Sequence, residues 1–152
     1  MNHAIESLRV KLQGDDLLPL FEEITAKAEE VDRVNREYNE WAVKMMESTG
    51  TSDPEIEALK NEDCDGKARQ CINMIVLSFT MITVAPPAHR KWAEEKLVGK
   101  MKEAVRSWQE VIDHLEPQIM LAKMAVACDT KKEKSESPAM KRMRGDIDYG
   151  VN

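Results

Sequence analysis

Two long stretches of this chain carry apolar residues in heptad spacing, and this pattern constrains the fold more than any other feature. The first runs from Leu17 to Met45 and the second from Val98 to Val126, with the seam residues alternately three and four positions apart. Such spacing keeps an apolar stripe on one side of a long helix, and another helix must cover that stripe. The chain is therefore predicted to consist of long, packed helices. The first heptad is Leu17, Phe21, Ile24, Ala28, Val31, Asn35, Tyr38, Ala42 and Met45, and the second is Val98, Met101, Val105, Trp108, Ile112, Leu115, Ile119, Ala122 and Val126.

Breaks in the first half of the chain separate two predicted helices. Gly14 ends a short helix over residues 3–13, and a long helix follows as far as about residue 48. A low count of Phe, Tyr and Gly (two, two and six residues) argues against a sheet protein, which needs more aromatic and turn residues.

The second half is predicted to form two further helices. The third helix begins near Asp53, contains a kink or a short loop at residues 61–66, and ends before Pro86 because the residue preceding a proline avoids helical geometry. The fourth begins near Ala88 and continues through Pro117 as a kink, since the heptad keeps its phase there. The expected fold is all-α: an antiparallel bundle of three long helices plus a short N-terminal helix, with coiled-coil-like packing.

The charge distribution divides the chain into an acidic body and a basic tail. The 152 residues carry a net charge of −6; residues 1–128 hold 16 basic and 23 acidic residues, whereas residues 131–144 hold six basic and two acidic ones. We expect one helical domain over residues 1–130 and a flexible, disordered tail over residues 131–152. The acidic body disfavours nucleic-acid binding, so only the tail is expected to contact phosphate.

No motif in the chain points to catalysis, a cofactor or a metal. The run from Asn61 to Gly66 resembles half of a calcium loop, but Ile72 stands where the closing Glu is required. The histidines lack the Glu-x-x-His spacing of di-iron bundles, and no Gly-rich phosphate loop occurs. We therefore predict a protein that is not an enzyme and has no cofactor. The most apolar window, about 14 residues over 72–85, is shorter than the ~17–25 needed to span a bilayer, and the odd cysteine count suits an intracellular protein of the nucleus or cytoplasm.

Four residues are the predicted contacts for a partner. A polar residue such as Asn35 within an apolar seam specifies register and partner number in coiled coils, so a homodimer through this seam is one interpretation. Trp41, Trp92 and Trp108 are the aromatic anchors, since aromatic residues dominate interface energetics. Each of the four is also a reasonable core residue. A second apolar column beside the later seam (Leu97, Ala104, Val111 and Ala125) indicates that the fourth helix contacts two neighbours.

The tail contains a segment, Ser137–Asp146, that resembles a monopartite nuclear import signal. Its basic core consists of Lys141, Arg142 and Arg144. The alternatives are a phosphate contact and a tail that only maintains solubility. Ser137 precedes a proline and is a candidate phosphorylation site, whose added charge would oppose the basic core.

Together these features predict a non-enzymatic scaffold or adaptor. It would be a subunit of a larger assembly, nuclear if the import signal is used, and would dock another protein or a second copy through apolar helix faces. The alternative is a nucleic-acid-associated structural protein of viral or chromatin type, which oligomerises through the bundle and contacts phosphate with its tail.

Overall fold

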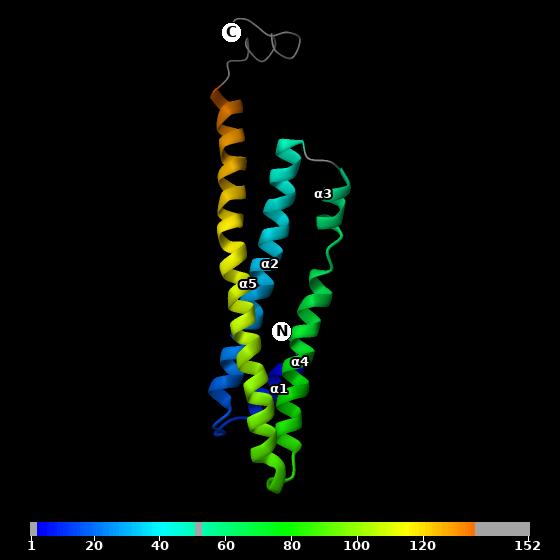
Figure 1. Cartoon of the computed structure of the whole chain (residues 1–152), viewed down its shortest axis with the longest axis vertical. Coiled ribbons are helices and arrows are strands. Elements are labelled where there is room, and N and C mark those ends of the chain that lie inside the picture. The colour runs from blue at the N-terminus through cyan, green and yellow to red at the C-terminus, as the bar shows by residue number, and fades with distance from the viewer. Residues whose placement is uncertain (1–2, 51–52, 136–152) are drawn as a thin grey trace, which may run out of the picture. The chain divides into compact units, whose positions relative to one another are not determined.

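The computed structural model describes residues 3–50 and 53–135, which form five helices and no strand. The helices are α1 (His3–Lys11), α2 (Leu18–Thr49), α3 (Asp53–Lys60), α4 (Cys64–Val84) and α5 (Pro87–Ser135), and Figure 1 shows α2 and α5 as long continuous ribbons. The prediction of an all-α fold is confirmed. The prediction that α5 continues through Pro117 is also confirmed.

The break predicted within residues 61–66 as a kink or a short loop is a short loop. The third predicted helix is two helices, because the chain leaves helical geometry at Asn61–Asp63 and restarts at Cys64. The restart is fixed by Asp63, whose carboxylate accepts a hydrogen bond from the backbone N–H of Gly66 at 2.8 Å and caps α4. A Cβ at position 66 would lie 2.2 Å from that carboxylate, so glycine makes the close approach possible. Within the acidic run Asn61–Gly66, Asp63 is thus the N-terminal cap of α4.

The ends of the other helices follow ordinary turn chemistry. Gly14 (φ 78°) lies between α1 and α2, and Gly50 (φ 76°) follows α2; at both points the backbone is in the left-handed region that glycine adopts without steric cost. Pro19 lies in the first turn of α2, where a missing N–H leaves no hydrogen bond unmade. The last five residues of α5 lie within the predicted tail, and the rest of that tail lies outside the described residues.

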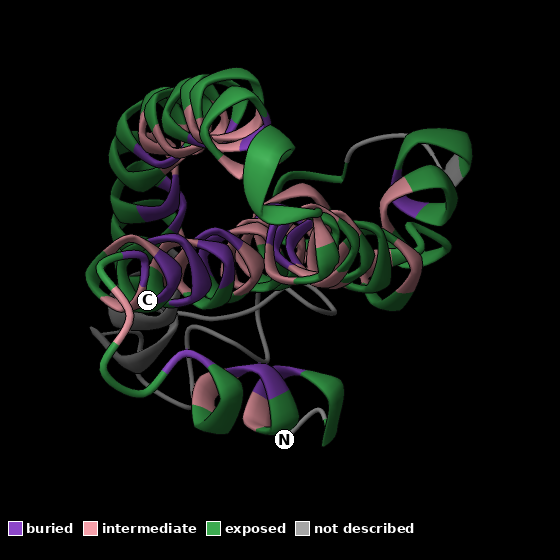
Figure 2. Ribbon diagram, turned by 90° about the horizontal axis from the view of Figure 1, so that it is seen from below, coloured by how far each residue is buried: buried purple, intermediate pink, exposed green. Residues whose placement is uncertain are grey.

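The described residues fall into two compact units. Unit 1 holds those up to Tyr38 together with Glu62–Glu116; unit 2 holds Asn39–Asn61 and those from Pro117 onward. In Figure 2 the buried residues follow one side of each helix and the exposed residues follow the other. This one-sided burial is what the heptads predicted: none of their members is exposed, and Phe21 and Met101 are almost fully buried.

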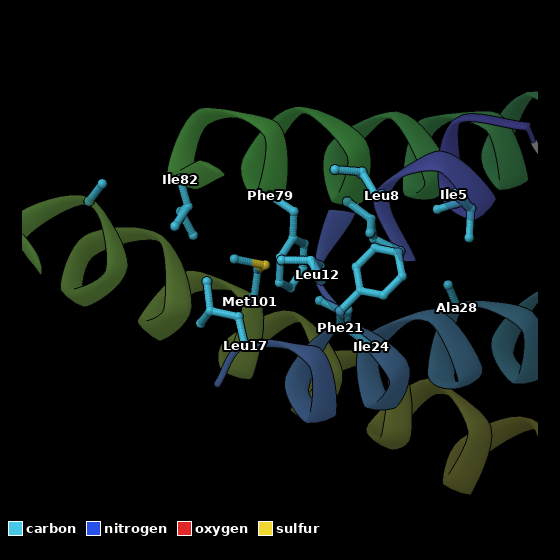
Figure 3. Packing of buried hydrophobic residues seen from close by; sticks show 12 residues of the cluster. Ile5, Leu8, Leu12, Leu17, Phe21, Ile24, Ala28, Phe79, Ile82 and Met101 are labelled. Carbon is cyan, nitrogen blue, oxygen red and sulfur yellow. The ribbon is translucent and has the colours of Figure 1, made fainter. Parts of the chain in front are cut away.

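The core of unit 1 is built from α1, α2, α4 and α5. Phe21 and Phe79 meet edge to face, with ring centroids 5.0 Å apart and an interplanar angle of 89°. Figure 3 shows Leu12 and Met101 beside these rings. Aromatic pairs in this geometry add about 0.5–1.5 kcal/mol beyond burial. The buried cluster consists of Ile5, Leu8, Leu12, Leu17, Phe21, Ile24, Ala28, Ile75, Phe79, Ile82, Ala93 and Met101.

Unit 2 is formed by the C-terminal part of α2, the short α3 and the C-terminal part of α5. Its buried apolar residues are Ala42, Ile56, Ile119 and Ala122. Asn39 on α2 donates a side-chain hydrogen bond to the carbonyl of Leu59 at 3.3 Å, and Lys60 pairs with Glu47 at 3.1 Å, so α3 is tied to α2. Two of the four buried residues are alanines, and this unit therefore buries less apolar side chain than unit 1.

Candidate interaction surface

The most apolar exposed surface of unit 2 lies on α5 between Pro117 and Cys128, the yellow-to-orange part of that helix in Figure 1. We call it the α5 patch and define it as Pro117, Met120, Leu121, Met124 and Cys128. Met120, Leu121 and Met124 are 63%, 62% and 58% exposed. Because residues three and four positions apart are neighbours on a helix, these side chains form one continuous surface.

The α5 patch lies opposite the buried seam of the same helix segment. Ile119 and Ala122 are buried, and with about 100° of rotation per residue the patch residues fall on the other side of the helix. Between Pro117 and Cys128 the only charged residue is Lys123. Its ammonium lies 5.5 Å from the centroid of the Trp41 ring and makes a cation–π contact with that indole. The α5 patch is therefore apolar without interruption.

Sequence reasoning did not select Met120, Leu121 or Met124. A signal was present, since residues 117–128 contain a single charge and are apolar on positions outside the heptad. The most apolar window, residues 72–85, carries the same signal. Ile75, Phe79 and Ile82 are buried there, whereas Leu77, Met81 and Val84 are exposed. An all-round apolar helix segment is normally enclosed by neighbours, and on α5 the neighbours do not enclose it.

The three tryptophans lie in three different environments. Trp108 is half-buried and packs against the core cluster of unit 1, whereas Trp92 is 63% exposed at the beginning of α5. Trp41 is half-buried, with the ammonium of Lys44 lying 4.3 Å from its ring centroid, in addition to that of Lys123. Such cation–π contacts hold an indole in place at roughly 0.5–1 kcal/mol each. Among the predicted anchors, Trp92 is thus the one that presents most of its surface to solvent.

Asn35 faces α4 of the same molecule. It lines a small hollow of about 20 Å³ together with Val31 on α2 and Cys64, Lys67 and Cys71 on α4. Burial raises the pKa of the Cys71 thiol, and the Asp32 carboxylate adds to that increase, so the protonated thiol is favoured at neutral pH. The role of Asn35 in self-association stays a prediction.

A larger cavity of about 210 Å³ lies between α1, α2 and α4. Ile5, Ala28 and Ile72 contribute apolar walls, and Asp32 and Glu29 bring carboxylates to it. The Thr25 hydroxyl, also part of the lining, donates to the Phe21 carbonyl at 2.7 Å. Its volume is below the roughly 300–1,000 Å³ typical of small-molecule sites.

Two carboxyl groups of unit 1 have pKa values that are lowered by ion pairs. The guanidinium of Arg90 lies 2.8 Å from Asp15 and, by hydrogen bonding, lowers the pKa of that carboxyl; the backbone N–H of Leu17 contributes further. The Arg36 guanidinium lowers the pKa of Asp65 in the same way, across 2.6 Å. The first pair joins α5 to the loop before α2, and the second pair joins α4 to α2. Each carboxylate is held ionised by a neighbouring arginine, which is the arrangement of a structural contact.

Across residues 3–50 and 53–135, no three His, Cys, Asp or Glu side chains lie close enough together to hold a metal ion. No helix in that part of the chain combines the length and the apolarity needed to cross a membrane.

Ser137, Lys141, Arg142 and Arg144 lie outside the described residues. Their roles as a phosphorylation site and as an import signal or phosphate contact stay predictions from the sequence.

Comparison of the chain with protein-family models, with curated proteins and with solved structures found no match.

Proposed function

We propose that this protein is a non-enzymatic scaffold that docks an α-helix of another polypeptide onto the α5 patch. The observation that carries the proposal is the continuous exposure of Met120, Leu121 and Met124, each more than half exposed. Covering apolar surface stabilises a complex by about 25 cal/mol for every Å² removed from water. Methionine is flexible and polarisable, which suits a surface that adapts to a partner.

The architecture we propose is an antiparallel bundle in which α2, α4 and α5 pack through coiled-coil-like seams. Its support is the agreement between the heptad positions and the buried residues, such as Phe21, Ile24 and Met101. Unit 2 contains the ends of two long helices and the short α3, and one face of its α5 segment is uncovered. A docked helix would complete the packing in the helix-in-groove manner, with apolar anchors at every third and fourth residue.

The basic tail extends this proposal to targeting. Lys141, Arg142 and Arg144 would bring the scaffold to the nucleus through an import receptor, in line with the segment's resemblance to an import signal. If the tail instead binds phosphate, binding should weaken steeply with salt and be lost on deletion of residues 131–144.

Site-specific photo-crosslinking tests the docking surface. A photoreactive amino acid is placed at Leu121 and, as a matched control, at Leu77 on α4, which is 58% exposed. We expect discrete crosslinked species from position 121 in cells, which are lost in a Met120→Gln/Met124→Gln variant and form again with purified components. Identical crosslinking profiles from the two positions, or profiles unchanged by the double substitution, would overturn the proposal.

A further inference from the structure

The cavity of about 210 Å³ between α1, α2 and α4 lies within unit 1 and combines apolar walls with an acidic rim. Ile5 on α1 and Ala28 on α2 are buried, and Figure 3 shows them pointing toward one another. Ile72 on α4 contributes a third apolar wall. Glu29 is exposed and Asp32 is half-exposed, so their carboxylates lie where the cavity meets solvent.

The volume of this cavity suits a small ligand. It is below the range of drug-sized sites, yet it exceeds the roughly 150 Å³ of an engineered apolar cavity that binds benzene. Apolar side chains form most of its lining. A single aromatic ring or a short alkyl chain therefore fits the space.

The polar groups of the cavity accept hydrogen bonds and do not donate them. The buried Thr25 hydroxyl donates its hydrogen to the Phe21 carbonyl at 2.7 Å, so only its oxygen lone pairs are left for a ligand. The ionised carboxylates of Asp32 and Glu29 are acceptors only. Asp32 already receives a hydrogen bond from Arg36 at 2.9 Å, whereas Glu29 makes no hydrogen bond or ion pair with another described residue. A bound molecule must therefore bring the donors itself, and Glu29 is the acceptor that is open to it.

We propose that this cavity binds a small organic ammonium ion, with its apolar body between the three helices and its ammonium group at Glu29. An –NH₃⁺ group has donors and no acceptor, which is the complement of this lining. Hydrogen bonds between an ammonium and a carboxylate are also stronger than neutral ones. An anion of the same size would meet like charges, which oppose its binding. The site lies in unit 1 and does not depend on the α5 patch.

The first test titrates the full-length protein with benzylamine, benzyl alcohol and benzoate, which have similar size and are a cation, a neutral molecule and an anion at neutral pH. Binding is followed through the NMR signals of isotope-labelled isoleucine methyl groups. We expect benzylamine to shift Ile5 and Ile72, which line the cavity, and to leave Ile56 of unit 2 unchanged.

The order of the three affinities decides this test. Benzylamine should have a dissociation constant at least about threefold below that of benzyl alcohol, as expected for a partly exposed ion pair, and benzoate should not bind. Equal binding of benzylamine and benzyl alcohol identifies an apolar hollow without selection for charge and overturns the proposal. The absence of a saturable shift of Ile5 and Ile72 with benzylamine overturns it as well.

The second test changes the carboxylate at the rim. Glu29→Gln keeps the size of the side chain and removes its charge. Glu23→Gln is the matched control, because Glu23 is an exposed carboxylate of α2 that does not line the cavity. We expect Glu29→Gln to raise the dissociation constant of benzylamine at least about threefold and to leave that of benzyl alcohol unchanged, while Glu23→Gln binds both like the wild type. Equal benzylamine affinity of the two variants overturns the role of Glu29.

Filling the cavity distinguishes this site from binding elsewhere on the surface. Ala68 lines the cavity from α4, and Ala68→Leu places a larger side chain there. We expect this variant to bind neither benzylamine nor benzyl alcohol, while circular dichroism shows the helical content of the wild type. Undiminished binding of benzylamine by a folded Ala68→Leu protein overturns the cavity as the site. If Ala68→Leu does not fold, the comparison of Glu29→Gln with Glu23→Gln decides the proposal by itself.

Discussion

Units 1 and 2 differ in how fully their helices enclose apolar side chains. Unit 1 draws on four helices and buries two phenylalanines and several aliphatic residues. Unit 2 has the ends of two long helices and a two-turn helix, and two of its four buried residues are alanines. Both units contain heptad positions of α2 and α5. In both units the seam residues of α5 are covered, but in unit 2 the face of α5 opposite the seam stays exposed. The number of neighbouring helices therefore decides how much apolar surface beyond the seam is enclosed.

Removing the central aromatic residue of unit 1 should have the largest effect on stability. Phe79→Ala deletes a fully buried ring and its edge-to-face contact with Phe21, so the free energy of unfolding should fall by about 3–5 kcal/mol. Urea unfolding followed by circular dichroism measures the loss. Phe79→Leu is the control and should lose less, because it fills more of the space. Phe79→Ala could instead lower the free energy of unfolding by less than about 1 kcal/mol, well below the usual cost of emptying a packed core site. That result would show that unit 1 is packed as loosely as unit 2.

The same substitution in both units compares them directly. Ile75 on α4 is fully buried and Ile56 on α3 is 7% exposed. Ile75→Ala should cost about 3–4 kcal/mol and Ile56→Ala about 2 kcal/mol, because the site with fewer neighbours collapses more easily around the deleted atoms.

Amide hydrogen exchange provides a second comparison of α4, which holds Ile75, and α3, which holds Ile56. Amides of α3 should exchange through local opening at a lower free energy than those of α4. Equal costs of the two alanine variants, with equal amide protection in α3 and α4, would contradict the contrast between the units.

Much of the fold was predictable because heptad spacing reports directly on burial. Phe21, Met101 and Ile112 lie at seam positions and are buried, as predicted. The break between α3 and α4 was predicted within residues 61–66, but whether it was a kink or a short loop stayed open, because the acidic run Asn61–Gly66 was compared with a calcium loop and not with a helix cap. Asp63 lies three residues before Gly66, and a carboxylate at this spacing also indicates the N-terminus of a helix.

The interaction surface was less predictable, since exposure depends on the number of neighbouring helices and not on the residue itself. Trp92 and Trp108 have the same chemistry, yet one is exposed and the other packs against the core cluster. Met120 and Met101 differ in the same way. Periodicity gives the direction of a side chain from its helix axis, but the presence of a neighbour in that direction is a property of the tertiary fold.

The half-buried ion pair of unit 1 should give a smaller, pH-dependent effect. Arg90 lowers the pKa of Asp15 below its ordinary value of 3.8, so the pair stabilises the fold above that pH and the contribution is lost as pH falls through the lowered pKa. Asp15→Asn should cost about 1–2 kcal/mol at neutral pH, and the difference from wild type should shrink on acidification below pH 3.8.

A double variant serves as the control for this pair. Asp15→Asn combined with Arg90→Gln should lose little more than either single variant, because both remove the same contact. A difference between wild type and Asp15→Asn that grows as the pH falls would contradict the assignment.

The exposed ion pair of unit 2 should give the smallest effect. Glu47 and Lys60 are 3.1 Å apart, and both side chains are about half exposed. Glu47→Gln should therefore change the free energy of unfolding by no more than about 0.5 kcal/mol, and the change should vanish in about 1 M salt, where screening is strong. Urea unfolding at low and high salt measures both. If Glu47→Gln costs as much as Asp15→Asn, polar contacts hold α3 in place as firmly as they hold the start of α2. The contrast between the units would then rest on their apolar residues alone.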